Sequence, residues 1–210
     1  NLQDYLNLNG KINFLKTHNG NYTVNNYPFT NSQNTIGGIY LVRDPRDVLL
    51  SFSNHLKLSH ENVFEKMVSM DHFELDENDP NLKGGYKRSL IGSWSNHYLS
   101  WKSYKGRELL FLKYEDLVKN PYRNFHKVLT YLKNFVPLEL DDEKIKSSIE
   151  ITSFENLKKN EEDEGFIEQG MSREFFRKGI IGDWKSSLRP ELLNKIESKF
   201  KKEMMELGYI

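Results

Sequence analysis

The stretch Ile39-Tyr-Leu-Val-Arg-Asp-Pro-Arg-Asp-Val-Leu-Leu-Ser51 predicts a strand, a tight turn and a helix in immediate succession. Its first four residues are apolar, which is typical of a buried strand. Asp44 suits the N-cap of the following helix and Pro45 suits its first position. Asp47 falls at the third position, where a carboxylate faces free backbone amides. The stretch is therefore a strand-turn-helix unit of the kind that builds α/β folds.

Arg43 and Ser51 flank the start of this predicted helix. Arg43 sits where the strand ends, and Ser51 follows about two turns into the helix. A helix N-terminus with a cation beside it binds anions well. The pattern fits a phosphate site, and it also fits an ordinary helix cap beside a surface arginine.

Length and composition indicate a single domain of residues 1–210 with a core of its own. The 30 basic residues balance the 30 acidic ones, so nothing points to a nucleic acid as partner. No apolar run is long enough to span a membrane, and no signal peptide opens the sequence. The absence of cysteine excludes disulfides and thiolate metal sites and suits a reducing compartment. We expect a cytoplasmic protein without a membrane or nucleic-acid partner.

Short apolar runs alternate with segments of helical periodicity. The predicted strands are 12–17, 39–42 and 109–112, the predicted helices are 45–56, 61–70, 86–104, one starting at 121, 141–150 and 190–207, and the predicted loops are 19–36 and 71–85. This alternation predicts a three-layer α/β/α fold with a central parallel sheet covered on both faces. Such sheets bind ligands beyond the carboxyl ends of their strands. One edge is therefore expected to carry the residues that follow the three strands: Lys16, His18, Arg43 and Tyr114.

Several short motifs follow one another in a fixed order. The strongest are Phe14-Leu-Lys-Thr-His18, the stretch 39–51, and Phe176-Arg-Lys-Gly-Ile-Ile-Gly-Asp-Trp-Lys185. Weaker ones are Tyr114-Glu-Asp-Leu with Asn120-Pro121, Thr152-Ser-Phe154 before Leu157-Lys-Lys-Asn160, and Gly92-Ser-Trp94 with His97. Together they resemble the cytosolic-type sulfotransferases, which use 3'-phosphoadenosine 5'-phosphosulfate (PAPS). The resemblance runs from about residue 12 to about residue 185 and implies a nucleotide-kinase-like P-loop fold.

The resemblance implies which residues hold the 3'-phosphate of PAPS. These are Arg43 and Ser51, with Arg177, Lys178 and Gly179 closing from the far end of the chain. Arginine grips phosphate with two parallel bonds, and a glycine lets backbone amides approach an anion. The alternative for this last segment is a basic turn after an apolar pair.

For adenine, the resemblance implies Tyr114, Thr152 and Phe154. Adenine needs an apolar slot with a few polar contacts. Simpler alternatives exist for two of the three. Tyr114 fits a core residue at the end of a strand, and Thr152 or Ser153 fits a cap for the helix that follows.

His18 is the candidate general base, because the acceptor must lose a proton as it attacks and histidine titrates near operating pH. Lys16 lies on the same side of the predicted strand and can neutralise charge on the departing sulfonate oxygens. The alternatives are a histidine that is hydrogen-bonded in a loop and a solvated lysine.

Trp94, Tyr98 and Trp101 recur at helical spacing and are expected in the core. His97 lines the acceptor site by analogy with the family. No metal is expected, because Lys and Arg can neutralise the phosphate and sulfonate charges and no metal-ligand spacing occurs. The acidic run Glu161-Glu-Asp-Glu164 is interpreted as a solvated loop.

Two family features are missing from the sequence. Relatives carry, ahead of Lys-Thr-His, a strand and a loop like Pro-Lys-Ser-Gly-Thr-Thr-Trp that wraps the 5'-phosphosulfate, but only fifteen residues precede Lys16. We expect a domain whose N-terminal strand and phosphosulfate loop lie outside this sequence; otherwise the protein cannot hold the sulfonate end of PAPS. The family's C-terminal dimer motif is absent from Lys185-Ser-Ser-Leu-Arg-Pro-Glu191, so the oligomeric state is left open.

The leading hypothesis is transfer of a sulfonate group from PAPS to a hydroxyl or amine of a small-molecule acceptor. His18 is the base, and 3',5'-ADP (PAP) is the product. The alternative is a non-catalytic module of the same fold that only binds 3',5'-ADP. A nucleotide kinase is disfavoured, because the sequence contains neither Gly-x-x-x-x-Gly-Lys-Ser/Thr nor a magnesium carboxylate.

Overall fold

Strands and helices alternate through the part of the chain that the computed structural model describes, which is residues 3, 10–76, 87–166 and 175–210. The strands are β1 (Thr23–Val24), β2 (Tyr27–Pro28), β3 (Ile39–Val42), β4 (Phe73–Asp76), β5 (Lys87–Leu90) and β6 (Leu110–Lys113). The helices are α2 (Pro45–Leu56), α3 (His60–Val68), α4 (Trp94–Lys102), α5 (Tyr114–Lys119), α6 (Pro121–Leu132), α7 (Asp142–Ile151), α8 (Phe154–Glu164), α9 (Trp184–Ser187), α10 (Pro190–Lys199) and α11 (Lys201–Glu206).

The centre of the fold is the parallel pair of β3 and β6. Ile39 lies opposite Leu110 and Val42 lies opposite Lys113, so the two strands end together. The segments that follow them, which lead into α2 and α5, leave the sheet at the same edge. This confirms the predicted parallel sheet and the predicted meeting of two strand ends. The other strands form two small antiparallel pairs, β1 with β2 and β4 with β5.

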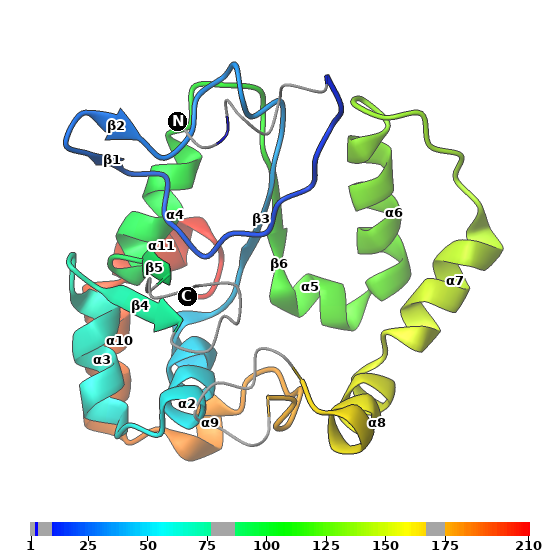
Figure 1. Cartoon of the computed structure of the whole chain (residues 1–210). Helices are drawn as coiled ribbons and strands as arrows, with labels where there is room; N and C mark the ends of the chain where they lie inside the picture. The colour runs from blue at the N-terminus through cyan, green and yellow to red at the C-terminus, as the bar shows by residue number, and fades with distance from the viewer. Residues whose placement is uncertain (1–2, 4–9, 77–86, 167–174) are drawn as a thin grey trace.

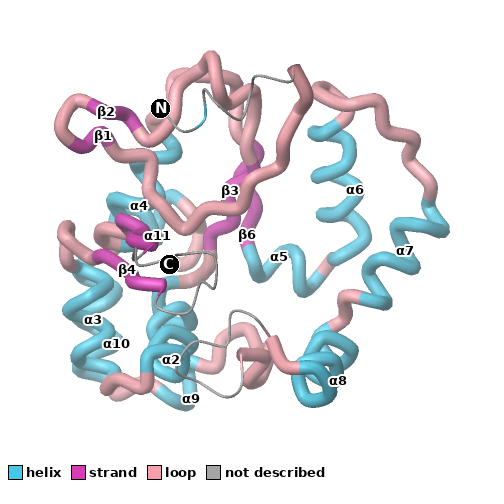
Figure 2. Tube along the Cα trace, viewed as in Figure 1, coloured by secondary structure: helices cyan, strands magenta, loops and turns pink. Residues whose placement is uncertain are grey.

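Helices lie on both sides of the β3–β6 pair (Figures 1 and 2). One group contains α2, α3, α4, α10 and α11, and the other contains α5, α6, α7 and α8. On the first side, the ring of Tyr98 from α4 lies 6.1 Å from Tyr40 of β3 and 5.9 Å from Phe111 of β6. On the second side, α6 packs against β6. The predicted α/β class is confirmed.

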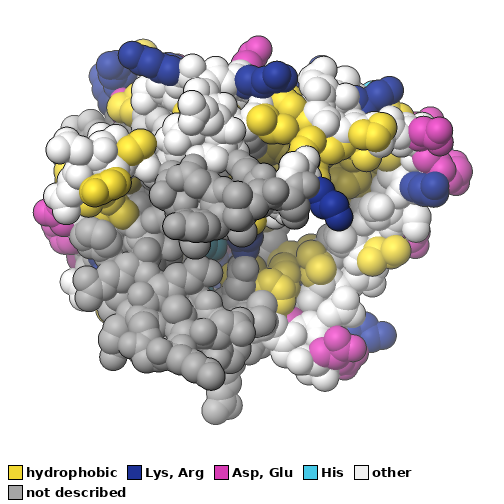
Figure 3. Space-filling view, turned by 45° about the horizontal axis from the view of Figure 1, so that its top comes forward, with side chains coloured by type: hydrophobic (Ala, Val, Ile, Leu, Met, Phe, Trp, Pro, Cys, Tyr) yellow, Lys and Arg dark blue, Asp and Glu magenta, His cyan; other side chains and the backbone are white. Residues whose placement is uncertain are grey.

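The two faces of β3 are covered unequally. Val42 is 3% exposed, whereas Ile39 and Leu41 are 43% and 52% exposed. Alternate residues of a strand point to opposite faces, so one face is packed and the other is open. Figure 3 shows hydrophobic side chains gathered around a hollow on the surface of the molecule.

The hydrophobic core lies between α2, α3, α10 and α11. Its buried side chains are Leu49, Leu50, Val63, Met67, Leu192, Ile196, Phe200 and Met204. The Trp94 ring lies 5.3 Å from that of Phe200, which joins α4 to the same core. Trp94 and Tyr98 are therefore packing residues, as their spacing predicted. Trp101 is half-buried and lies outside this core, with its ring 5.9 Å from that of Phe29. Within the described residues, no helix has the length and apolar character needed to cross a membrane.

The prediction of a strand over 12–17 is wrong. Residues 10–22 are all described, and they contain no strand. An extended segment becomes a strand only when its backbone pairs with a neighbour, and this one pairs with neither strand of the central sheet. Its apolar side chains are exposed, Phe14 by 68%. Lys16 and His18 are therefore presented by a loop rather than by a strand end.

The prediction of one helix over 86–104 is also wrong in its first part. Residues 87–90 form β5, and the helix α4 begins only at Trp94. Gly92 has a φ of +67°, which breaks the helix, and Ser93 caps α4 by accepting a hydrogen bond from the Asn96 amide at 3.2 Å. The predicted loop 71–85 contains β4, and its remainder from 77 lies outside the described residues.

Two further predictions change at the level of single elements. The acidic run at 161–164 is the end of α8, not a solvated loop, and Glu161 is only 7% exposed. The predicted helix over 190–207 is interrupted at Phe200 into α10 and α11. The helix at Pro121 forms as expected.

Replacing Phe200 by alanine should destabilise the protein by about 3–5 kcal/mol, because Phe200 is 0% exposed and its loss leaves a cavity between α10 and Trp94. Urea unfolding measures this change. Met205→Ala is the matched control, since Met205 is 59% exposed on α11 and should cost far less. Equal destabilisation by the two variants would contradict the placement of the core.

Candidate active site

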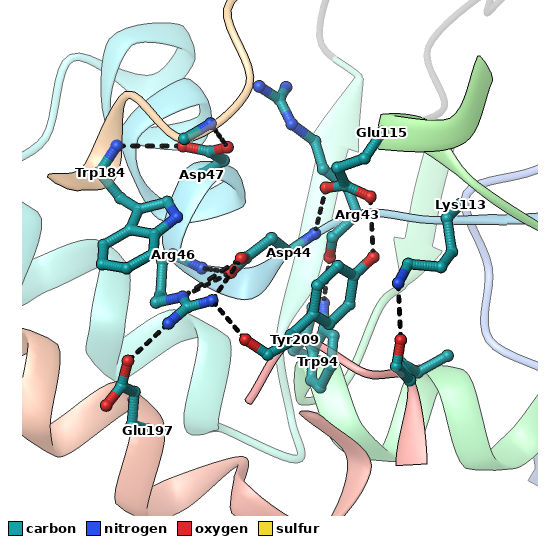
Figure 4. Close-up of polar contacts among 12 residues, drawn as sticks. Arg43, Asp44, Arg46, Asp47, Trp94, Lys113, Glu115, Trp184, Glu197 and Tyr209 are labelled. Carbon is teal, nitrogen blue, oxygen red and sulfur yellow. Dashed lines mark hydrogen bonds and ion pairs between the residues drawn. The ribbon is translucent and has the colours of Figure 1, made fainter. Parts of the chain in front are cut away.

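A buried network of charged groups fixes the turn between β3 and α2 (Figure 4). The Asp44 carboxylate accepts a hydrogen bond from the Arg46 amide at 2.9 Å and from Arg46 Nη2 at 2.7 Å. Arg46 Nη1 donates to Glu197 at 2.5 Å, and the guanidinium lies 3.8 Å from the Trp184 ring centroid. Because Arg46 is 4% exposed and fully engaged, its role is structural. The turn is therefore held rigidly while Arg43 points away from the network.

Arg43 meets the start of α5 and the C-terminal part of the chain. Val42 pairs with Lys113, so the next residues, Arg43 and Tyr114, emerge side by side. The guanidinium carbon of Arg43 lies 4.4 Å from the Tyr114 ring centroid, and Nη2 donates to the Ile180 carbonyl at 3.3 Å. Arg43 Nε is buried and has no hydrogen-bond partner in the described part of the chain. The geometry brings together residues more than a hundred positions apart and leaves one buried donor unused.

Gly179 and Phe154 form the next part of the same surface. Gly179 has a φ of +63°, and a Cβ atom there would lie 2.6 Å from Cδ2 of Phe154. Only glycine suits both the left-handed backbone and the close contact. Phe154 is the first residue of α8, which Ser153 caps by accepting from the Asn156 amide at 3.3 Å. A predicted phosphate residue and a predicted adenine residue are thus in direct contact.

Arg177 and Lys178 are both paired with Asp183, six and five residues further along the chain. Arg177 Nη2 lies 2.8 Å and Lys178 Nζ 2.9 Å from its carboxylate oxygens. Hydrogen bonds from Lys178 and then Arg177 hold the pKa of Asp183 below its ordinary value. Asp183 therefore stays ionised and keeps the two cations on one side of this turn.

Asp47 ties the segment of Gly182 and Trp184 to α2. Its carboxylate accepts from the Gly182 amide at 2.6 Å and from the Trp184 amide at 3.1 Å, and Asp47 is 2% exposed. The prediction that Asp47 faces free amides is correct in kind, but the amides belong to a distant segment. Ser51 is exposed on α2 one turn beyond Asp47, on the same face of the helix.

Within the described part of the chain, the Thr152 hydroxyl bonds to α7 and not to Tyr114 or Phe154, the other predicted adenine residues. Its hydroxyl donates to the Ser148 carbonyl at 2.7 Å at the end of α7, where Thr152 is the C-cap. The alternative, in which Thr152 or Ser153 caps the helix that follows, is met by Ser153, while Thr152 ends the preceding helix.

His18 lies in a loop whose backbone is fixed through His97 and Tyr40. His97 Nε2 contacts the His18 carbonyl at 3.2 Å, and the Tyr40 hydroxyl lies 2.8 Å from His97 Nδ1. A carbonyl can only accept, so Nε2 carries the proton and Nδ1 accepts from Tyr40. Burial lowers the pKa of His97 and keeps the ring neutral for this arrangement.

The loop after His18 is bonded to α4 and β5 as well. Trp101 Nε1 donates to the Asn19 carbonyl at 3.0 Å, and the Gly20 amide donates to the Leu90 carbonyl at 2.9 Å. His18 and Lys16 are both exposed at this end.

Arg43 and the histidine contact therefore lie at different points along β3. Arg43 follows the last residue of the strand, and Tyr40 contacts His97 near its start. Tyr40, which contacts the His97–His18 pair, precedes Arg43 by three residues, or roughly 10 Å along a strand. Within residues 10–76, 87–166 and 175–210, no group of three or more His, Cys, Asp or Glu side chains is arranged to hold a metal. The arrangement has an arginine end at Arg43 and a histidine end at His18 and His97.

A model of the sulfotransferase domain matches residues 4–208, almost the whole chain. The chain belongs to the sulfotransferase family. This confirms the resemblance seen in the motifs. Among its relatives, dog sulfotransferase 1B1 is 30% identical over 187 residues, which is 82% of this chain and 56% of the relative. Cytosolic sulfotransferase 8 of Arabidopsis thaliana is 31% identical over 180 residues, which is 81% of this chain and 50% of the relative.

Solved sulfotransferase-like structures share the fold. Mouse sulfotransferase SULT7A1 complexed with PAP has a TM-score of 0.59 and 24% identity, over 79% of this chain and 58% of the other. Retinol dehydratase in complex with androsterone and PAP has a TM-score of 0.54 and 23% identity, over 79% and 46%. This member of the sulfotransferase family spans about half the length of the curated relatives it matches.

The sequence did not predict the residues of this sulfotransferase-family chain that hold the candidate site residues in place through hydrogen bonds and ion pairs. They are Tyr40, Glu161, Asp183 and the distant target of Asp47. Asp47 and Asp183 could have been predicted as anchoring residues, because each is an acidic residue inside a motif. No local pattern distinguishes Glu161 from its acidic neighbours.

Replacing Asp47 by asparagine should lower the free energy of unfolding by about 1–3 kcal/mol, because a carboxamide cannot accept well from both buried amides. Urea unfolding measures the change, and Asp71→Asn, at an exposed position, is the control. If the two variants were equally stable, the Asp47 contacts would not anchor the segment.

Proposed function

We propose that this chain binds the adenosine 3'-phosphate part of PAPS, and of its product 3',5'-ADP, next to Arg43, Tyr114, Phe154 and Gly179. We propose further that the full-length protein transfers the sulfonate group to a hydroxyl or amine of a small-molecule acceptor. Membership of the sulfotransferase family supports this reaction. Both solved relatives described above are complexes with PAP, which supports the nucleotide.

The observation that carries the proposal is the environment of Arg43. Its guanidinium is stacked on Tyr114 and bonded to Ile180, yet its buried Nε has no partner among the described residues. A buried donor without a partner is costly, and a phosphate oxygen is the strongest acceptor for a guanidinium. Ser51 extends the phosphate site from the same helix as Asp47.

Arg177 and Lys178 add positive charge to the 3'-phosphate site in this proposal. Their pairing with Asp183 keeps both cations beside the Gly179 turn before a ligand arrives. Asp183 accepts from both, so the phosphate shares these cations with a carboxylate. Arg43 has no acidic partner among the described residues and therefore offers the larger change in interaction on binding.

Adenine would lie against the aromatic side chains of Tyr114 and Phe154. The two residues begin α5 and α8, and both contact the Arg43–Gly179 region from different sides. Aromatic faces provide the apolar slot that a purine needs. Thr152 precedes Ser153 at the same helix start and would supply a polar contact at the rim.

His18 is the proposed base and Lys16 the proposed electrostatic partner. PAPS supplies an activated sulfonate group when it is bound. His18 accepts the proton that the acceptor hydroxyl or amine loses as it forms its bond to sulfur, while the bond from sulfur to the phosphate oxygen breaks. Lys16 stabilises negative charge on the departing side. The rabbit relative named amine sulfotransferase, 29% identical over 188 residues, supports amines among the acceptors.

The alternative is a module that binds 3',5'-ADP without catalysis. It shares the nucleotide contacts but assigns no role to His18, so the effects of replacing Arg43 and His18 separate the two possibilities.

Replacing Arg43 by alanine should weaken binding of 3',5'-ADP by about 10- to 100-fold, because a charged hydrogen-bond donor to the phosphate is removed. Affinity for 5'-AMP, which lacks the 3'-phosphate, should change little. Titration calorimetry measures both, with Arg123→Ala on the exposed part of α6 as the control. Equal affinity of the unmodified chain for the two nucleotides would contradict the proposed phosphate site.

Replacing His18 by alanine should reduce sulfonate transfer by about 100-fold or more in the full-length protein, since general base catalysis contributes on that scale. Affinity for 3',5'-ADP should stay the same. Transfer from labelled PAPS to a panel of phenols, alcohols and amines measures the rate, with His126→Ala on α6 as the control. Normal turnover by the His18 variant would exclude it as the base.

A further inference from the structure

Glu161 is a buried carboxylate that accepts hydrogen bonds from the backbone at the start of the segment carrying Arg177 and Gly179. It is 7% exposed on α8, although its neighbours Glu162 and Asp163 are exposed. Its Oε1 accepts from the Phe175 amide at 2.6 Å, and its Oε2 accepts from the Phe176 amide at 2.9 Å. Both oxygens are therefore committed to two consecutive backbone amides, immediately before Arg177.

The same segment is held at its other end by Asp47. Asp47 accepts from the amides of Gly182 and Trp184, in the same two-oxygen manner. The proposed phosphate-binding residues 177–179 lie between these two anchors. Two carboxylates from two helices thus fix both ends of a stretch that has no regular secondary structure of its own between 175 and 183.

The helix α8 contacts this segment at two points. Its first residue, Phe154, lies against Gly179, and Glu161 reaches the segment about 10 Å further along the helix axis. The spacing between Phe154 and Glu161 therefore sets the distance over which the chain runs from Phe175 to Gly179. A shift of the Glu161 contact would move Arg177 relative to Arg43.

The chemistry at position 161 requires a carboxylate. A carboxylate presents acceptors on both oxygens, and its bonds to backbone amides are charge-assisted. Glutamine has the same shape but one acceptor and an amino group that would face an amide hydrogen. An isosteric replacement should therefore release one of the two amides without opening a cavity.

We propose that Glu161 is a positioning residue for the 3'-phosphate site, acting through the backbone of Phe175 and Phe176. It does not touch the ligand; it fixes the path of the chain that carries Arg177 and Gly179 up to Ile180, whose carbonyl accepts from Arg43. This inference rests on the proposed function only for the identity of the ligand, since the backbone contacts are independent of it.

Two measurements on Glu161→Gln in the whole chain test this inference. The first is hydrogen exchange of backbone amides. We expect the Phe175 or Phe176 amide to exchange at least 10-fold faster, while Gly182 and Trp184, bonded to Asp47, keep their rates. The second is titration calorimetry with 3',5'-ADP and 5'-AMP. The preference for 3',5'-ADP should fall by about 10-fold.

Glu162→Gln is the matched control, because it removes the same charge one residue away at an exposed position. It should leave both the exchange rates and the nucleotide preference unaltered. Glu161→Asp, which keeps the charge on a shorter side chain, should recover part of the preference and remains informative if the glutamine variant folds poorly.

The outcomes separate this inference from the proposed function. If the unmodified chain does not prefer 3',5'-ADP over 5'-AMP, the proposed function fails, and the exchange measurement still tests the anchor. If the unmodified chain prefers 3',5'-ADP and Glu161→Gln prefers it equally, the positioning role of Glu161 is overturned. Unchanged exchange at both Phe175 and Phe176 would overturn it as well.

Discussion

The two hydrogen bonds that Asp47 accepts from Gly182 and Trp184 are the constraint on which the candidate site depends. They join the first turn of α2 to a segment 135 residues later, and they are buried. Arg43 precedes that turn, so fixing the segment at Asp47 also brings the Ile180 carbonyl within reach of its guanidinium. The register of β3 and β6 then places Tyr114 on the other side of Arg43. Pairing along the sheet and one side-chain anchor across it together build a single surface from distant parts of the chain.

Charge is distributed in this region so that most groups are matched internally. Arg46 is balanced by Asp44 and Glu197, and Arg177 and Lys178 are balanced by Asp183. A buried charge without a partner is expensive, which explains why Arg46 is paired with Asp44 inside the motif Arg-Asp-Pro-Arg-Asp. Arg43 differs from Arg46 because its neighbours are an aromatic ring and a carbonyl, neither of which neutralises it. Among the described residues of this region, the Arg43 guanidinium is therefore the one that no carboxylate neutralises.

Local patterns predicted the parts of the fold whose determinants are local. The strand at Ile39, its cap at Asp44 and the helix after it follow from apolar periodicity and first-turn chemistry, and all three form. The expected burial of the strand holds for one face only, because Ile39 and Leu41 are exposed. The segment 12–17 has the composition of a strand but lacks a pairing neighbour, and composition cannot supply one. The helix predicted from residue 86 failed because Gly92 turns the chain and the preceding residues pair with β4. Of the residues implied for the nucleotide, Arg43, Tyr114, Phe154 and Gly179 are brought together. Glu161 was interpreted as part of a solvated loop, because burial of one acidic residue among four depends on tertiary contacts that the sequence does not show.

The two ends of the site rest on different kinds of support. The Arg43 end is built on helix starts and on carboxylates that hold backbone amides, so its geometry follows from rigid elements. The histidine end is a loop held by side chains of α4 and by the backbone of β5. His97 connects this loop to β3 through Tyr40, and its neutral ring is suited to donate to one group while accepting from the other. Since Tyr40 lies in β3 and Arg43 directly follows its last residue, that strand is the common reference for both ends and sets the separation between the His97 contact and Arg43.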